Sequence, residues 1–306
     1  AYERMQQEVK ASHILVKVDQ NALPEDTLAA YNKIMEARKR VTGGEDFSKV
    51  AKEISDDPSA KQNGGSLGYF GVFRMVYPFE TAAFETEVGE ISQPIRTRFG
   101  YHIVKVEDKR KARGEIKVAH IMVRTKEEMS DEEKKEAKKK INEIYEKVKA
   151  GEDFAVLARK HSDDQTTAPK GGELPWFSAG RMVPEFEQAA YSLEEDGEVS
   201  EPIKTDYGWH IIKRVDKKPV PSFEEAKNDI RAKISRDSRS QKSKEAVLQK
   251  IKKEYNLKEN KEAKQAFYTA IDSSIYQGKW KIEKAQALSD ELFKLGGESY
   301  NQQQFA

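Results

Sequence analysis

The residues of this sequence best suited to chemistry are its histidines and the polar residues that stand at fixed distances from them. Four of the five histidines form two pairs, His13 with His102 and His120 with His210. A lone histidine on a strand is most often a satisfied core residue, but paired imidazoles beside a carboxylate fix each other's tautomers and orient polar neighbours. In both copies an aspartate follows the first histidine at the same distance, so we expect each pair to belong to a polar site.

A domain duplication accounts for the two pairs. His13 and His120 lie in the motifs Ala-Ser-His-Ile-Leu-Val and Val-Ala-His-Ile-Met-Val, 107 positions apart. Further motifs keep this offset, which becomes 108 after a one-residue insertion near Asp196. In the first copy these motifs are Gly43–Phe47, Ser55–Asp57, Gly64–Leu67, Arg74–Val76, Gly89–Pro94 and Phe99–Ile103. A repeat of about a hundred residues has the size of a domain and is too long for a solenoid unit.

Both copies predict the same succession of elements. A strand carries the first histidine, and a charged amphipathic helix follows, over about 25–41 and 131–150. A second helix starts near Asp46 or Asp153, and then come a Gly-rich loop, a short strand and a short helix after the Met. Two strands joined by a glycine turn close the unit, at 91–97 and 101–106 in the first copy. Strands and helices mix without regular βαβ alternation, which indicates an α+β fold with an antiparallel sheet.

The segments outside the copies are predicted to be helical. Residues 1–9 look like the tail of a helix, and we expect the chain to be a mature or excised piece of a longer protein. After Pro219 and Pro221, a capping-box start at Ser222–Glu225 predicts helix to about residue 255. Apolar residues at helical spacing over 282–295 predict one more helix. The expected organisation is a helix tail at 1–9, domains at 10–109 and 117–216, and a helical C-terminal region at 222–306. Whether this last region is complete is left open by the sequence.

The composition excludes several classes of function. The chain has 306 residues, of which 54 are basic and 53 acidic, and it has no cysteine. Nucleic-acid-binding proteins usually show a basic excess, so no nucleic-acid partner is expected. The lack of cysteine excludes disulfide scaffolds, cysteine nucleophiles and thiolate zinc sites. No apolar run is long enough to span a membrane, and no signal-peptide pattern opens the sequence.

The motifs of both copies resemble those of parvulin-type peptidyl-prolyl cis/trans isomerases, the rotamase or PpiC family. Their order is that of the family: His-Ile-Leu-Val, Ser-x-Asp/Cys, Gly-Gly-x-Leu-Gly, Met-x-x-x-Phe and Phe-Gly-x-His-Ile. The resemblance implies, for each copy, a four-stranded antiparallel sheet with surrounding helices. It implies catalytic residues at His13, Asp57, Thr97, His102, His120, Asp164, Thr205 and His210. It implies substrate-binding residues at Leu67, Met75, Phe79, Phe99, Leu174, Met182, Phe186 and Tyr207.

The chemistry of such a site needs neither a metal nor a cofactor. Rotation about a peptide bond meets a barrier of about 18–20 kcal/mol, whereas the two X-Pro isomers are nearly balanced, so only the barrier has to fall. Leu67, Met75 and Phe79 would hold the proline ring, and Asp57 would set the polarity beside the substrate carbonyl. Alone, Met75 and Phe79 would indicate core packing; together with the other motifs they indicate a pocket.

The two copies differ at the rim of the expected pocket. Phe73 stands where the second copy has Gly180, and Gly68 stands where it has Pro175. We therefore expect unequal activities, in an order that these residues leave open. The stretches after the first strand, 17–21 and 124–128, concentrate no positive charge, so no phosphoserine requirement is expected.

The resemblance leaves two interpretations of function. In the first, the chain is an isomerase that acts on X-Pro bonds of unfolded or exported polypeptides and has a folding-chaperone role. In the second, it is a chaperone or peptide-binding protein whose parvulin modules catalyse little. Two copies in series with flanking helices resemble the SurA-type chaperone-isomerases of the bacterial cell envelope, which implies a periplasmic location. An open or a plugged pocket beside each aspartate would discriminate between the two interpretations.

Overall fold

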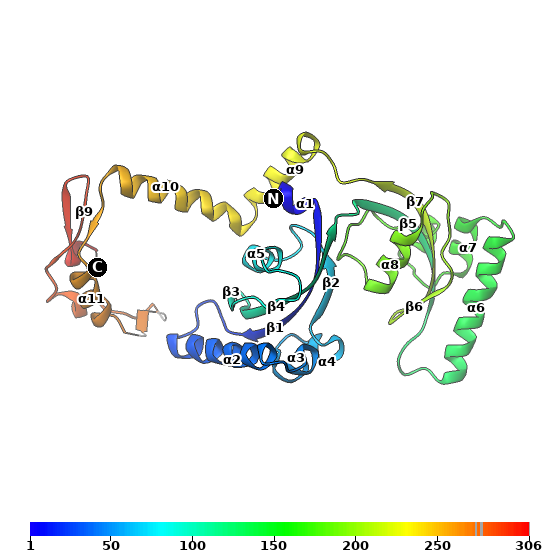
Figure 1. Ribbon diagram of the computed structural model, residues 1–306, viewed down its shortest axis with the longest axis horizontal. Helices are drawn as coiled ribbons and strands as arrows, with labels where there is room; N and C mark the ends of the chain where they lie inside the picture. The colour runs from blue at the N-terminus through cyan, green and yellow to red at the C-terminus, as the bar shows by residue number, and fades with distance from the viewer. Residues whose placement is uncertain (273, 276–277, 306) are drawn as a thin grey trace.

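Two antiparallel sheets, one in each copy of the repeat, organise the computed structural model, which describes residues 1–272, 274–275 and 278–305 (Figure 1). The first sheet has four strands in the order β2-β1-β4-β3. Its strands are β1 (Gln7–Lys17), β2 (Ser66–Phe70), β3 (Ile95–Thr97) and β4 (Gly100–Lys111). The helices of this unit are α2 (Pro24–Thr42), α3 (Phe47–Ile54), α4 (Ala60–Asn63) and α5 (Tyr77–Glu85). β1 pairs with β4 along its whole length, which brings the first histidine motif beside the last motif of the copy.

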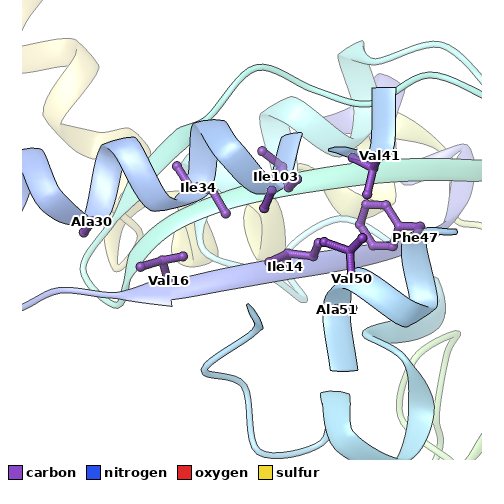
Figure 2. Close-up of a cluster of buried hydrophobic side chains, with 10 residues drawn as sticks. Ile14, Val16, Ala30, Ile34, Val41, Phe47, Val50, Ala51 and Ile103 are labelled. Carbon is purple, nitrogen blue, oxygen red and sulfur yellow. The ribbon is translucent and has the colours of Figure 1, made fainter. Parts of the chain in front are cut away.

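Strand alternation divides the first unit into two cores. Ile14 and Ile103 point toward α2 and α3, where they pack with Phe47 and with aliphatic residues of these helices (Figure 2). Their neighbour Val104 packs on the opposite face with Phe79 of α5. Because successive side chains of a strand point to opposite faces, the residue order in β1 and β4 decides which side chains pack on each face of the sheet.

The second unit repeats this design with one strand fewer. Its sheet has the order β5-β7-β6. Its elements are β5 (Glu115–Arg124), α6 (Asp131–Lys149), α7 (Phe154–His161), η1 (Ala168–Lys170), α8 (Pro184–Ser192), β6 (Ile203–Thr205) and β7 (Gly208–Lys218). In place of the expected fourth strand, two isolated bridges join Ile116 to Phe177 and Ala119 to Glu173. The expectation of four strands is wrong here because Pro175 stands where the first copy has Gly68, whose φ of 64° a proline ring cannot adopt.

The helix boundaries within the copies agree with the sequence. The first long helix of each copy matches the expected range, and Asp46 and Asp153 cap the next helix by accepting hydrogen bonds from the backbone N–H of Lys49 and Val156. Such a cap is worth about 1 kcal/mol, which explains why both copies begin this helix at the same point. None of the helices in the described ranges combines the length and apolar character that crossing a membrane requires.

The N-terminal helix is shorter than expected. Helix α1 spans only Tyr2–Met5, and the chain is already in strand β1 from Gln7 onward. The expectation of helix through Val9 is wrong because β4 extends to Lys111 and provides backbone partners for 7–10, and Val9 is fully buried in the sheet. A register shift between Lys10 and Ala11 accommodates this extension.

The C-terminal region combines helices with a small three-stranded sheet. Helices α9 (Phe223–Ser235), η2 (Ser238–Ser240), α10 (Gln241–Glu254) and α11 (Lys261–Ala270) are followed by η4 (Ile282–Ala285) and α12 (Gln302–Phe305). The helix expected over 282–295 is wrong, because β9 (Glu291–Leu295) pairs with β8 (Lys258–Glu259) and β10 (Glu298–Asn301). Gly296 and Gly297, both with positive φ, form the hairpin turn that a helix could not contain. Positions 273, 276, 277 and 306 of the expected region lie outside the described residues.

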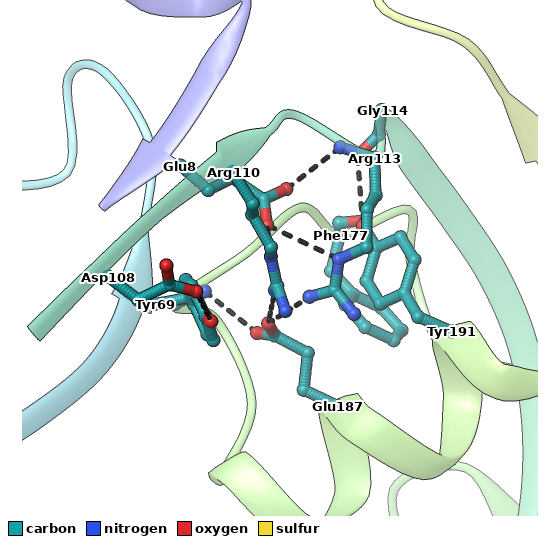
Figure 3. Close-up of polar contacts among 10 residues, drawn as sticks. Glu8, Tyr69, Asp108, Arg110, Arg113, Gly114, Phe177, Glu187 and Tyr191 are labelled. Atoms are coloured by element: carbon teal, nitrogen blue, oxygen red, sulfur yellow. Dashed lines mark hydrogen bonds and ion pairs between the residues drawn. The ribbon is translucent and has the colours of Figure 1, made fainter. Parts of the chain in front are cut away.

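A buried charge network joins the two units where β4 leads through residues 112–114 into β5 (Figure 3). Glu8 accepts hydrogen bonds from Arg110 Nε at 2.7 Å and Arg113 Nε at 3.2 Å, and Arg113 Nη2 donates to Glu187 at 2.7 Å. Both guanidinium groups also lie over tyrosine rings. Breaking a buried ion pair leaves an uncompensated charge, so this network fixes how the two units sit against each other.

Candidate functional site

The two histidines of the first copy lie side by side on the sheet face that α5 covers. His13 on β1 and His102 on β4 have ring centroids 5.6 Å apart, and the ring of Phe79 stands edge-on to both, at 5.6 and 5.4 Å. The antiparallel register of β1 and β4 places Leu15 opposite His102, which sets His13 two residues away on the same face. The sheet therefore brings the two residues together although they are far apart in the chain.

A continuous hydrogen-bonded chain runs from Asp57 to Thr97. His13 Nε2 lies 2.8 Å from Asp57 Oδ2, the Nδ1 atoms of His13 and His102 are 3.4 Å apart, and His102 Nε2 lies 2.8 Å from Thr97 Oγ1. The backbone N–H of Phe99 donates to Thr97 Oγ1 at 3.1 Å. The two histidines, Asp57 and Thr97 thus form a hydrogen-bonded ladder, with the aspartate at one end and the threonine at the other.

The Asp57 carboxylate, at one end of the ladder, sets which atom donates in each of its hydrogen bonds. An ionised carboxylate can only accept, so His13 donates from Nε2 and is left with an accepting Nδ1. His102 must then donate from Nδ1 and accept at Nε2 from the Thr97 hydroxyl. Both imidazoles are neutral in this arrangement, and the negative charge stays at Asp57.

The second copy repeats the ladder with the same spacing. His120 Nε2 lies 2.8 Å from Asp164 Oδ2, the His120 and His210 Nδ1 atoms are 3.4 Å apart, and His210 Nε2 lies 2.8 Å from Thr205 Oγ1. The two copies thus place all eight residues expected to be catalytic in two equivalent ladders.

Thr167 belongs to the second ladder but was not predicted from the sequence. The Thr167 hydroxyl donates to Asp164 Oδ2 at 2.5 Å and lies 3.1 Å from His120 Nε2. The first copy has Ala60 at the equivalent position, and there Asp57 Oδ1 instead accepts from the hydroxyl and the backbone N–H of Ser59. A position-by-position comparison of the copies would have found this difference, which gives Asp164 Oδ2 a hydroxyl donor that Asp57 Oδ2 lacks.

Burial keeps the histidines neutral. Loss of solvent lowers the pKa of His102 to about 4 and that of His210 to about 3, and it also lowers the pKa of His13 and of His120. Burial raises the pKa of the Asp57 carboxyl, but hydrogen bonds from Ser59 and His13 outweigh this and leave that pKa below its ordinary value. The ladder is therefore an ionised aspartate on two neutral imidazoles at physiological pH.

These shifts predict that the protein loses stability in mild acid. Unfolded histidines take up a proton near pH 6.5, whereas His102 and His210 do so only near pH 4 and 3, so below pH 6.5 the unfolded state binds more protons. The free energy of unfolding is therefore fully retained above pH 6.5 and should fall by about 2 kcal/mol per copy between pH 7.5 and 5. Urea unfolding at the two pH values measures this fall, and a His102→Gln/His210→Gln chain should show a smaller one. An equal fall in that variant would contradict the assignment.

The residues expected to bind substrate surround each ladder at different depths. Phe79 and Phe186 are only 3% and 4% exposed and belong to the core, so they are not open to solvent as walls of a pocket would be. The half-buried members pack at the edge of the same clusters: Leu67, Met75, Leu174 and Met182. Phe99 and Tyr207 are 47% and 61% exposed at the turn that ends each ladder. Each phenylalanine thus forms a floor under the histidines, and the leucine and methionine form its accessible edge.

Comparisons with known proteins identify the same kind of domain in both copies. Two models described as the PPIC-type PPIASE domain match residues 13–108 and 105–218. Proteins named Chaperone SurA from Nitrosococcus oceani and Methylococcus capsulatus are 37% identical over 231 residues and 38% identical over 210 residues. The matches cover 73% and 67% of this chain but 52% and 45% of those proteins, so the chain spans about half the length of these relatives.

Solved structures of similar proteins match single parts of the chain. The peptidylprolyl isomerase PrsA from Bacillus cereus is 44% identical over 40% of this chain and 43% of its own, with a TM-score of 0.32. The parvulin of Nitrosopumilus maritimus is 39% identical over 33% of this chain and 97% of its own, with a TM-score of 0.28.

Proposed function

The chain belongs to the family of PPIC-type peptidyl-prolyl isomerases, and on this premise we propose that it catalyses cis/trans isomerisation of X-Pro bonds in polypeptides, with one site in each copy. The observation that carries the proposal is the ladder that both copies build with the same distances beside an apolar edge. Neither copy requires a metal, a cofactor or a covalent intermediate for this reaction.

The first part of the proposed mechanism is a grip on the proline ring. Met75 and Leu67 lie at the edge of the cluster whose floor is Phe79, and they offer the ring an apolar surface. Burying an apolar group of this size is worth roughly 1.5–3 kcal/mol. Such binding holds the proline while the preceding carbonyl turns about the C–N bond.

The second part is electrostatic. Resonance places negative charge on the carbonyl oxygen of a planar amide, and that charge decreases as the bond twists and resonance is lost. An ionised Asp57 beside the oxygen would disfavour the planar form relative to the twisted one, which lowers the barrier. The ladder holds the carboxylate in place and keeps the adjacent imidazoles neutral, so they do not cancel its field.

A second function, the holding of extended chains, is favoured by the exposed aromatic rings of Phe99 and Tyr207. We propose that the substrates are unfolded or exported polypeptides and that the protein acts in the periplasm, in keeping with its similarity to proteins named Chaperone SurA. No phosphoserine is needed in this proposal, because residues 17–21 and 124–128 offer no cluster of positive charge.

An isomerisation assay on a short peptide with one X-Pro bond tests the proposal. The intact chain should accelerate cis-to-trans conversion, measured by protease-coupled absorbance or by NMR exchange. Binding of the same peptide without acceleration would contradict the isomerase function and favour the chaperone function.

A further inference from the structure

Two buried glutamates at equivalent positions of the copies each hold the loop that carries the substrate-edge methionine. Glu80 Oε2 accepts the backbone N–H of Phe73 at 2.7 Å, and Glu187 Oε2 accepts that of Gly180 at 2.7 Å. Phe73 and Gly180 both have left-handed backbones, with φ of 63° and 78°. In each copy the held residue lies two positions before the methionine, so the carboxylate fixes the turn from which that methionine projects.

The arginines that neutralise these carboxylates come from different parts of the chain. Glu187 is paired with Arg113, from the connection between the two units. Glu80 is paired with Arg4 Nη1 at 3.1 Å and with Arg239 Nη2 at 2.9 Å. The loop of the first copy is therefore tied to both α1 and the C-terminal region, whereas that of the second copy is tied to the connection between the units.

Arg239 also covers the loop of the first copy directly. Its guanidinium lies over the rings of Phe73 and Tyr77, at 4.3 and 4.6 Å from their centroids, and the residue is 8% exposed. A non-glycine residue in the left-handed region costs of order 1–3 kcal/mol and persists only where its surroundings hold it. The stacked guanidinium and the Glu80 carboxylate supply that hold on Phe73.

The same loop is restrained from the other side by the second unit. Arg74 Nη2 donates to the carbonyl oxygen of Gly180 at 2.5 Å. Phe73 and Arg74 are thus both fixed by groups outside their own unit, and Met75 follows directly. This leaves the position of Met75 dependent on whether the C-terminal region is docked.

We infer that Arg239 is a positioning residue for the first isomerase site: by pairing with Glu80 and stacking on Phe73, it makes the placement of Met75 depend on docking of the C-terminal region. The inference rests on the proposed function only in that it calls this place an isomerase site. The second site lacks the direct pairing with Arg239, because its equivalent glutamate is paired with Arg113.

The test uses the intact chain with methyl-¹³C-labelled methionine, whose six residues give a spectrum that can be assigned by substitution. In Arg239→Gln, the Met75 methyl resonance should move while that of Met182 stays. In a Met182→Ala background, which leaves the first site to be measured, KM for an X-Pro peptide should rise about fivefold with a smaller change in kcat. Arg239→Lys keeps the charge without the planar stacking group and should restore part of both effects.

Arg236→Gln is the matched control, because it removes an equal charge from an exposed residue one turn earlier. It should leave the Met75 resonance and KM unchanged. If Arg239→Gln folds poorly, Glu80→Gln/Arg239→Gln removes both buried charges and keeps an acceptor for Phe73 N–H, and the Met75 resonance should still move.

A lower urea midpoint in Arg239→Gln with an unmoved Met75 resonance and an unchanged KM would overturn the inference and leave Arg239 a purely structural residue. If the first copy of the wild-type chain catalyses nothing, the isomerase proposal fails for that copy. The methyl resonance then decides the positioning role alone: movement upholds it, and an unmoved resonance overturns it.

Discussion

Phe186→Ala is expected to lower the free energy of unfolding of the second unit by about 3–5 kcal/mol. The ring is 4% exposed and packs edge-on against His120 and His210, each with a centroid distance of 5.5 Å. Its removal leaves a cavity under the ladder as well as losing buried apolar area. Since domains of this size have only about 5–15 kcal/mol of stability, urea unfolding followed by circular dichroism will show this loss clearly.

Tyr207→Ala provides the matched control, because it removes an aromatic ring of similar size that is 61% exposed at the same site. Its effect should stay within about 0.5 kcal/mol, as for most surface substitutions. Equal losses in the two variants would mean that Phe186 is not the floor of the site. The result also matters for activity measurements, since an inactive Phe186 variant could simply be unfolded.

Met75→Ala/Met182→Ala is expected to lower kcat/KM for an X-Pro peptide by about 10- to 100-fold while the chain stays folded. Each methionine is half-buried at the edge of its cluster, so its loss removes roughly 1.5–3 kcal/mol of contact with the proline ring, and each 1.4 kcal/mol corresponds to about tenfold in rate. The single variants report how activity is divided between the copies.

Met35→Ala is the control for this experiment. Met35 is also half-buried, but it lies on α2, across the sheet from the ladder. It should retain the wild-type kcat/KM. Full activity in the double variant would place the proline contact elsewhere.

The ladders could be predicted from the sequence because the duplication repeats every member in a nearly constant register. His13 and Asp57 recur 107 positions later and His102 recurs 108 positions later, together with the glycines and strand residues that position them. The same pattern could not show that Phe79 is a buried floor, because a phenylalanine four residues after a methionine suits a pocket wall and a core equally well. Burial is decided by what packs on the helix, and the local sequence does not contain that information.

The other features that the sequence did not predict also depend on the folded structure. The sequence shows that Pro175 replaces Gly68, but the positive φ of Gly68, which proline cannot adopt, is a property of the folded chain. The apolar residues of 282–295 fit a helical period until Gly296 and Gly297 turn the chain back into a hairpin. Arg239 lies 159 residues from Glu80, and no pattern within either segment links them.

The measurement that tests the central claim most directly is kcat/KM of the Asp57→Asn/Asp164→Asn chain on an X-Pro peptide, with unfolding in urea as the folding control. If each ladder exists to place a negative charge beside the twisting amide, this neutral replacement should reduce kcat/KM by roughly tenfold, as expected for loss of one electrostatic contact. Part of the activity should remain, because the apolar grip is intact and no covalent bond is formed. A folded variant with unchanged kcat/KM would contradict the account, because the ladders would then not lie beside the reacting bond.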